Sequence, residues 1–456
     1  MYQVTRTIVK RNEYPEYCSY FSTLGVSVTN LYNAGLFRVR QNFTIRGKEH
    51  PSDLELQVQE EIKLAVAQKH TKTPKSCLSY TFLEKLMRVT NNPDFFSGIP
   101  MQLAQNVVKH ACQDFKNWLA SVKEYKKAPD KFLGAPQMPQ YKKKGSVSGL
   151  HFTNQDCVIR DNNGKSYLKF PHFHGDYLPI GYVSGSLKEV RVRPYYSDFL
   201  VICVYETEST EPLPENGNVC GIDFGISNIV ALVSNTQKCM RYKGGALKAQ
   251  NQWYNKQRSY YQSIAMQGHE AKEAKQPGVL NTRHMEQLNR KRNQFFHDAL
   301  HKIASDVVKF CLENDIRAIV LGKNKNWKQN CNLGHHNNQI FVQMPIATLS
   351  YCIKYKAEEN GLFVMEQEES YTPKASLVDG DKIPVVGDQE KPSFSGKRVS
   401  GRLYCTKEQM LINADLNGAG NILRKAYPTA FEGITDYHFL NKMIVKKCNT
   451  MYSRNG

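Results

Sequence analysis

The chain has 456 residues, with 61 Lys and Arg against 42 Asp and Glu, which gives a formal net charge of +19. Its hydrophobic fraction of 41% and charged fraction of 23% are those of a globular protein and exclude a wholly disordered or collagen-like chain. No run of about 18 apolar residues is present, and the first ten residues are too polar for a signal peptide. We therefore expect a soluble, cytoplasmic protein without a membrane partner. The positive excess favours a nucleic-acid partner, although a merely basic enzyme has the same charge.

The twelve cysteines do not form the pattern of a zinc site. No two of them are spaced as C-x-x-C, the spacing that places two thiolates of a zinc ribbon on one tight turn. We expect reduced, mostly buried cysteines. His335 and His336 lie in a segment rich in Asn and Gly without a thiol or acid nearby, and there a polar loop is favoured over a metal site.

The first half of the chain predicts a strand, a helical region and then more strands. Residues 1–10 alternate as a strand does, and residues 14–128 are helical, with apolar residues at helical spacing over 104–122. Turn signals begin at about residue 129, and residues 150–215 contain several short strands that are consistent with a small β-barrel. Residues 208–218 have the composition of a linker into a further domain.

The second half has the element order of a ribonuclease H-like α/β fold. Strands are predicted at 219–223, 228–234 and 238–242, followed by helical sequence over 246–313. A buried strand at 317–321, a helix at 345–360, a strand at 362–366 and a last helix at 414–425 complete the order. The stretch 373–411 between the last strand and the last helix is irregular.

Acidic residues stand at the positions where such a fold would bind metal. Asp223 ends the first strand and Asp415 opens the last helix, so the two would converge on Mg²⁺ if that helix packs beside the strand. The strand at 317–321 should end in a third acid but is followed by Gly322. We hypothesise that Glu369, from the loop after the next strand, reaches over the space that the glycine leaves open. The alternative is a solvated acidic loop, and spacing alone does not separate the two.

Several motifs follow one another in the order found in one family. They lie at residues 27–41, 139–144, 221–228, 319–329, 332–345, 354–359, 368–376 and 412–425. By these motifs the chain resembles the TnpB (OrfB) family, the RNA-guided DNA nucleases of bacterial insertion sequences. The resemblance implies a RuvC nuclease domain at 216–372 that is completed by a final helix and tail at 412–456 and split by a target-nucleic-acid-binding insertion at 373–411. It also implies a wedge β-barrel, at 1–13 and 129–215, that contains a helical recognition domain at 14–128.

The resemblance also implies functions for individual residues. Asp223 and Asp415 match the first and third metal-binding acids of the family, whose three acids hold Mg²⁺ ions, two in the mechanism we expect. Gly322 replaces the second acid, as in Fanzor proteins and the branch near them, which carry a glutamate just before a Y-T-S-like motif. Glu369 matches that glutamate, with Glu368 as the fallback. Zinc is not expected, since the insertion has Cys405 alone where many relatives carry four cysteines.

The expected partners are a guide RNA from the end of the protein's own element and double-stranded target DNA with a short flanking motif. We expect a monomeric ribonucleoprotein, associated with the bacterial nucleoid. The candidate nucleic-acid contacts are Asn30, Tyr32, Arg38, Arg40, Gln41, Lys142, Lys143, Lys144, Arg290, Lys291, Arg292, Lys323, Trp327 and Lys328. Two other functions stay open: a guided DNA-binding repressor with an inactive nuclease site, and a DNA strand-transferase on the same fold.

Overall fold

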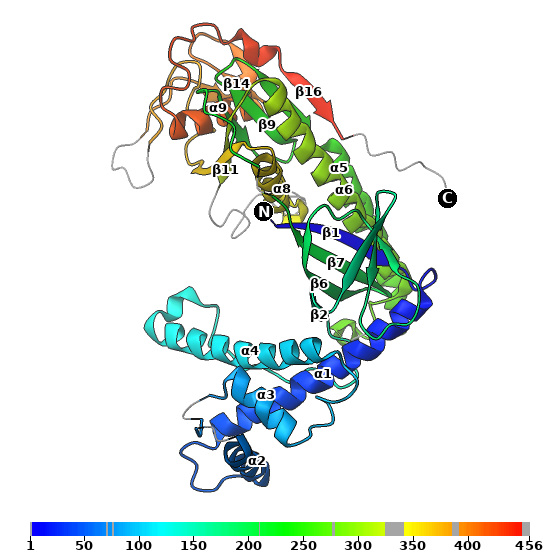
Figure 1. The fold of residues 1–456 in the computed structure, drawn as a ribbon. Coiled ribbons are helices and arrows are strands. Elements are labelled where there is room, and N and C mark those ends of the chain that lie inside the picture. The colour runs from blue at the N-terminus through cyan, green and yellow to red at the C-terminus, as the bar shows by residue number, and fades with distance from the viewer. Residues whose placement is uncertain are drawn as a thin grey trace. The chain divides into compact units, whose positions relative to one another are not determined.

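The structure is a computed structural model, and it describes residues 2–69, 72–74, 77–208, 210–275, 279–323, 342–384 and 392–448. The chain divides into two compact units, residues 1–208 and residues 209–456 (Figure 1). None of the helices in the described ranges is both long enough and apolar enough to span a bilayer. Of the eleven cysteines in these ranges nine are buried and none is in a disulfide with another, which confirms the prediction of mostly buried, reduced thiols.

The described residues of the first unit contain four α-helices, all within the region predicted to be helical. They are α1 (Pro15–Thr44), α2 (Asp53–Lys69), α3 (Tyr80–Val89) and α4 (Met101–Lys127), followed by the short 3-10 helix η1 (Pro129–Lys131). The proline at the start of α1 suits a first helical position, because its missing N–H would have no partner there. The predicted apolar stripe of α4 is buried, including Val108, Ala111 and Phe115, and α4 packs along α1.

The strands of the first unit form two antiparallel sheets. They are β1 (Tyr2–Val9), β2 (Leu150–Thr153), β3 (Val158–Asn162), β4 (Lys165–Lys169), β5 (Leu178–Ile180), β6 (Ser186–Tyr195) and β7 (Asp198–Glu206). One sheet has the order β1-β7-β6-β2 and the other β3-β4-β5. Strand β1 pairs with β7 along its whole length, from Tyr2 with Glu206 to Val9 with Phe199. All four helices are therefore inserted, in sequence, between two paired strands. The strands form two separate sheets, and this pairing does not establish a closed barrel, which stays a prediction.

The second unit is a mixed α/β fold with the predicted element order. A six-stranded sheet has the order β12-β11-β8-β9-β10-β16. Its strands are β8 (Val219–Asp223), β9 (Asn228–Ser234), β10 (Cys239–Lys243), β11 (Ala318–Lys323), β12 (Phe363–Glu368) and β16 (Ile444–Lys447). As predicted, β11 lies parallel to β8, and β12 lies parallel to β11 one strand further along.

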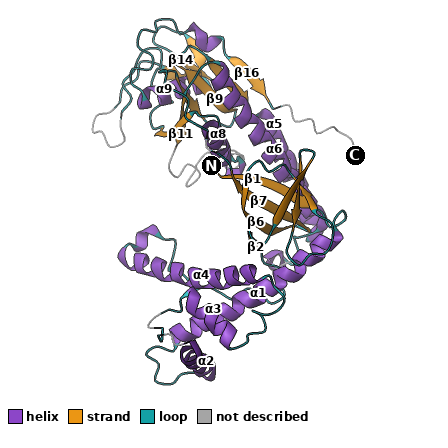
Figure 2. Cartoon of the chain, viewed as in Figure 1, coloured by secondary structure: helices purple, strands orange, loops and turns teal. Residues whose placement is uncertain are grey.

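Helices and a small sheet complete this unit (Figure 2). The helices are α5 (Gly245–Ala265), α6 (Arg283–Glu313), α8 (Ile346–Glu359) and α9 (Ala414–Ala426), with 3-10 helices η2 (Ala271–Lys275) and η3 (His438–Asn441). The small sheet contains β13 (Lys397–Arg398), β14 (Leu403–Cys405) and β15 (Leu411–Asn413), so the stretch predicted to be irregular is partly ordered.

Both faces of the six-stranded sheet are covered. Alternate side chains of β9 enter two different hydrophobic clusters, because successive residues of a strand point to opposite faces. Val230 and Leu232 pack with residues of α6 and α8, whereas Ala231 and Val233 pack with residues of α9. Every residue of β9 is buried, and its middle, residues 229–233, is apolar without interruption, as is typical of a strand covered on both faces. This packing places the start of α9 beside β8, at the edge where three parallel strands end.

Candidate active site

Three acidic side chains from distant parts of the sequence approach one edge of the sheet. Asp223 is the last residue of β8, Glu369 follows the last residue of β12, and Asp415 lies in the first turn of α9. Strands β8, β11 and β12 are parallel, so their carboxyl ends meet at the same edge. We call these three side chains the carboxylate cluster.

Glu369 lies over the glycine that replaces the expected acid. A Cβ atom placed on Gly322 would be 3.5 Å from the carboxyl carbon of Glu369 and 3.1 Å from the carbonyl oxygen of Ile222. It would also be only 2.7 Å from Cδ1 of Ile422 in α9. The space above Gly322 is thus filled from both sides, by the Glu369 side chain and by helix α9. Glu369 therefore reaches over Gly322 as hypothesised.

A second glycine lets the last helix approach Asp223. A Cβ on Gly418, one turn into α9, would lie 2.9 Å from Oδ2 of Asp223. Any larger residue there would push the helix away from β8 or displace the carboxylate. The glycine thus explains how Asp415, on the same helix, comes within electrostatic reach of Asp223.

The pKa shifts of the cluster reflect burial and mutual repulsion. Burial raises the pKa of Asp223 well above its usual range, and the nearby charges of Glu369 and then Asp415 raise it further. Burial also raises the pKa of Glu369 to about 7, with a smaller contribution from Glu368. Carboxylates held together in a buried place repel one another unless a cation or protons compensate them. The donor set, three carboxylates, is one that suits Mg²⁺.

Asp415 already has two partners. Its Oδ2 accepts a hydrogen bond of 2.7 Å from Nδ2 of Asn228, and its Oδ1 lies 3.6 Å from Nη2 of Arg398. In the ranges that the structure describes, no three His, Cys, Asp or Glu side chains are grouped closely enough to bind one metal ion together. The three carboxylates would therefore have to turn toward one another before they could hold one ion together.

Glu368 and Glu369 have different surroundings. Glu368 accepts hydrogen bonds of 2.7 Å from Nζ of Lys425 and from the backbone N–H of Ser370. Burial alone would raise the pKa of Glu368, but Lys425 and Ser370 outweigh it and lower the pKa. Glu369 is only 7% exposed and faces Gly322 and Asp223 instead. Of the two glutamates, the geometry therefore favours Glu369 for the cluster.

Buried asparagines of α9 hold the loop that carries Glu369. Nδ2 of Asn421 donates to the carbonyl oxygens of Thr372, at 3.1 Å, and Ala375, at 2.7 Å. Asn417 donates to the same Ala375 oxygen at 2.7 Å. Within the loop, the Thr372 hydroxyl and N–H donate back to the carbonyl oxygen of Glu369. The two asparagines were not identified from the sequence, although their spacing of four residues places them on one face of a helix.

Hydrogen bonds hold the described parts of the stretch 373–411, which lies between β12 and α9. The fully buried Tyr404 donates from its hydroxyl to the carbonyl oxygen of Lys374 at 2.8 Å. Asp379 and Asp381 accept hydrogen bonds from the backbone N–H groups of Lys407 and Ser376 at 3.0 and 2.7 Å. Leu403, its neighbour in β14, is 39% exposed, because it points to the other face of the strand.

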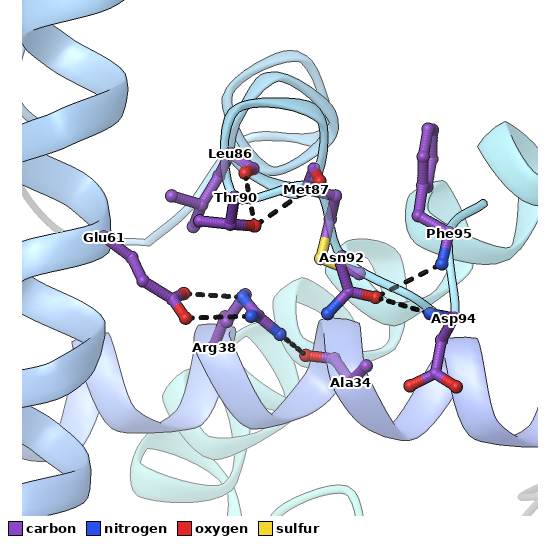
Figure 3. Close-up of polar contacts among 9 residues, drawn as sticks. All are labelled: Ala34, Arg38, Glu61, Leu86, Met87, Thr90, Asn92, Asp94 and Phe95. Atoms are coloured by element: carbon purple, nitrogen blue, oxygen red, sulfur yellow. Dashed lines mark hydrogen bonds and ion pairs between the residues drawn. The ribbon is translucent and has the colours of Figure 1, made fainter.

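Arg38 has a structural role in place of the expected nucleic-acid contact. Its Nε and Nη2 donate to the two carboxylate oxygens of Glu61 at 2.7 and 2.9 Å, and its Nη1 donates to the carbonyl oxygen of Ala34 (Figure 3). The residue is 8% exposed. A guanidinium engaged in this way does not face a base edge, so Arg38 is not proposed as a nucleic-acid contact.

Other candidates, on α1 and on the segment between η1 and β2, lie together. The Tyr32 hydroxyl donates to Asp114 at 2.8 Å, and Nζ of Lys142 lies 4.3 Å above the Tyr32 ring. Arg40 stacks on Tyr141 at 4.7 Å. The remaining candidates of this unit are exposed or partly exposed: Asn30, Gln41, Lys143 and Lys144.

The candidates of the second unit are partly engaged. Arg292 donates to Asn251 at 3.0 Å and stacks on Tyr254 and Phe296, so its head group supports the α5–α6 contact. Arg290 is partly exposed and Lys291 exposed, and Lys323 forms an ion pair with Glu366. Trp327, Lys328, His335 and His336 lie outside the described residues.

Two family models match the chain. Residues 202–328 match the OrfB_IS605 family, described as a probable transposase, and residues 347–422 match the Cas12f1-like TNB domain. The resemblance to the OrfB family that the motifs indicated is therefore confirmed over these residues. The placement near the Fanzor branch stays a prediction.

Among the solved structures that are similar to the chain are complexes of Cas12f and C2c1 proteins. A Cas12f1–sgRNA–target DNA complex has 13% identity and a TM-score of 0.44, over 90% of this chain and 84% of that one. A CRISPR-Cas12f ternary complex has 14% identity and a TM-score of 0.32, over 90% and 83%. The C2c1 protein of Alicyclobacillus acidoterrestris with single-guide RNA has 10% identity and a TM-score of 0.34, over 89% and 70%. A comparison with curated proteins finds no match. Since these scores are low, the function proposed for the chain depends on the family models and on its own geometry.

Proposed function

We propose that this chain, which matches the OrfB_IS605 and Cas12f1-like TNB models, is an RNA-guided DNA endonuclease. The observation that carries the proposal is the carboxylate cluster at the edge of the sheet. Three distant segments each contribute one acid, and Glu369 occupies the space over Gly322 where the strand itself supplies no acid. A decayed site would have no reason to retain a replacement acid at that place.

The cluster would hold two Mg²⁺ ions through Asp223, Glu369 and Asp415. Bound there, such ions activate water and stabilise the leaving 3′ oxygen of a phosphodiester. The protein's own contribution is positioning. Asn228 orients the Asp415 carboxylate by its hydrogen bond of 2.7 Å, and the two buried asparagines fix the loop of Glu369 against α9.

The domain assignments form part of the proposal. Residues 1–13 and 129–215 would be the wedge domain, and residues 14–128 the recognition domain within it, which the pairing of β1 with β7 supports. Residues 216–372 and 412–456 would be the nuclease domain. The insertion at 373–411 would bind target nucleic acid, and it lies within the match to the TNB model.

The proposed partners are a guide RNA from the end of the protein's own element and double-stranded DNA with a short flanking motif. Base pairing with the guide would select the target, and the protein would read the flanking motif and the shape of the duplex. The net charge of +19 suits a monomeric protein that carries both polyanions.

The test compares cleavage with binding in Asp223→Ala. The protein is purified with the RNA that accompanies it, this RNA is sequenced, and a matching DNA target is offered with Mg²⁺. We expect wild type to cut the target and Asp223→Ala to bind the RNA equally well without cutting. Cleavage by a purified Asp223→Ala complex would refute the assignment of the site.

Gly322 favours one other function, a guided DNA-binding repressor with an inactive nuclease site. That protein would bind its guided target tightly, and neither wild type nor Glu369→Gln would cut it in Mg²⁺. Cutting by wild type and loss of cutting in Glu369→Gln would exclude the repressor.

A further inference from the structure

A basic cavity lies beside the carboxylate cluster. Its volume is about 200 Å³, and the side chains around it are those of Ser227, Asn228, Arg241, Lys243, Lys248 and Arg402. Four of these six are cationic, and of the described residues none that lines the cavity is acidic. We call this feature the basic pocket.

The four cations of the basic pocket come from three separate elements. Arg241 and Lys243 lie on β10, and Lys248 lies in the first turn of α5. Arg402 lies between β13 and β14 of the insertion. Positive charges gathered in this way repel one another, and the N-terminal end of the 21-residue helix α5 adds its own partial positive charge. An anion bound among the cations would lower this repulsion.

Arg241 provides a second, independent sign of a missing ligand. Its Nε atom is buried, and among the described residues this N–H has no hydrogen-bond acceptor. A buried donor without an acceptor has given up its hydrogen bonds to water without replacement, so native structures rarely contain one. Arg241 also lines the pocket, and guanidinium groups bind phosphate through paired N–H donors, so a phosphate there would offer acceptors to its head group.

One residue, Asn228, links the basic pocket to the candidate active site. Asn228 lines the pocket and at the same time donates to Oδ2 of Asp415 at 2.7 Å. The three carboxylates repel a polyanionic strand that approaches them. The cations of the basic pocket, which Asn228 links to Asp415, would offset that repulsion. The position thus matches a phosphate of the same strand that the cluster acts on.

We propose that the basic pocket binds a backbone phosphate of the DNA strand next to the phosphodiester that is hydrolysed. The inference rests on the proposed function, which it extends from the type of reaction to the way the substrate strand is held. Arg241 and Arg402 would contact the phosphate directly, and Lys243 and Lys248 would neutralise its charge. These residues position the strand and do not take part in bond cleavage.

The test measures the salt dependence of DNA binding in complexes that cannot cut. In an Asp223→Asn background with guide RNA, the pocket variants Arg241→Gln, Lys248→Gln and Arg402→Gln, singly and as a triple variant, are compared with Lys238→Gln. Lys238 is exposed and lies just before the start of β10, at the end opposite Lys243, so it controls for loss of one charge. The probe is a fluorescent single-stranded DNA complementary to the guide.

Each lost phosphate contact should lower the slope of log K against log salt by about 0.7 for a single strand. We expect this decrease for the pocket variants, no decrease for Lys238→Gln, and a wild-type slope for Arg241→Lys, which keeps the charge. Circular dichroism melting identifies a variant that fails to fold, and Arg241→Lys then supplies the comparison. A triple variant with the same slope as Lys238→Gln would overturn the proposal.

The same experiment distinguishes a DNA phosphate from the guide RNA as the occupant of the basic pocket. If the variants lose affinity for the guide RNA and keep their slope for DNA, the pocket holds the guide and the proposal is wrong. Binding of oligothymidine is also measured with guide-free protein. If the pocket variants lower that slope while wild type retains no guide and cuts nothing, the pocket binds a DNA phosphate and it is the proposed function that fails.

Discussion

The carboxyl carbon of Glu369 lies 3.5 Å from the point where a Cβ of Gly322 would stand. Strand β11 carries a glycine where the acid is expected, and the acid of the next loop occupies the place over it. An acid displaced along the chain by 47 residues can therefore reach the same edge of the sheet, because β12 lies directly beside β11.

Replacement of Glu369 should affect cleavage far more than replacement of its neighbour. Glu369→Gln should slow guided DNA cleavage by more than about 100-fold, since even residues that merely support metal ligands contribute 10–100-fold. Glu368→Gln breaks the ion pair with Lys425 and should cost at most about 1 kcal/mol of stability. Initial cleavage rates in Mg²⁺ measure the difference. Equal rates in both variants would contradict the assignment of Glu369 to the cluster.

A methyl group on Gly322 should disturb the site. Gly322→Ala places a Cβ 2.7 Å from Cδ1 of Ile422 and 3.1 Å from the Ile222 carbonyl oxygen. Overpacking of this kind costs about 1–3 kcal/mol, so we expect a lower free energy of unfolding in urea and slower cleavage. Gly134→Ala, where a Cβ meets nothing within 4 Å, is the control and should behave as wild type. Unchanged stability and cleavage in Gly322→Ala would show that this space is not restricted.

Loss of the Asn421 side chain should loosen the loop that carries Glu369. Asn421→Ala leaves the buried carbonyl oxygens of Thr372 and Ala375 with fewer donors, which should cost about 1–3 kcal/mol in urea unfolding. We also expect the variant to require more Mg²⁺ for half-maximal cleavage. The exposed Asn360→Ala, which loses a hydrogen bond to Lys356, serves as control. A Mg²⁺ requirement equal to that of wild type would separate Asn421 from the site.

The cap of helix α2 should make the protein sensitive to acid. Ser52 and Glu55 form a capping box, and Glu55 also accepts hydrogen bonds from Lys48 and Thr44. Lys48 first, then the Ser52 N–H and Thr44, lower the pKa of Glu55 to about 2. A carboxyl whose pKa is lower in the folded state stabilises the fold above its unfolded pKa, near 4.3. This stabilisation is lost as the pH falls through that value toward 2.

Melting temperatures of Glu55→Gln measured from pH 7 to pH 2 test this. The variant should melt below wild type at pH 7, and the two should converge on acidification. Glu60→Gln removes an equally charged but exposed side chain of the same helix and should change little at any pH. A difference between wild type and Glu55→Gln that is independent of pH would contradict the lowered pKa.

Much of the second unit could be predicted from local sequence. The apolar run at 229–233 predicted a strand that is buried on both faces. The helical spacing of apolar residues over 296–311 predicted a helix that is buried on one face. The parallel placement of the strands and the positions of Asp223 and Asp415 followed from the element order. Asn417 and Asn421 were not identified, since an amide can be buried only when a partner is in place, and their partners lie more than 40 residues earlier.

By itself the sequence determined the order of elements, the family resemblance and which acids were available, because these depend on local composition and period. Only the tertiary structure decided that Glu369 and not Glu368 faces the cluster, that Arg38 is committed to Glu61, and that four cations gather beside Asn228. Those outcomes depend on which side chains from distant segments meet, and the packing of helices on the sheet determines that.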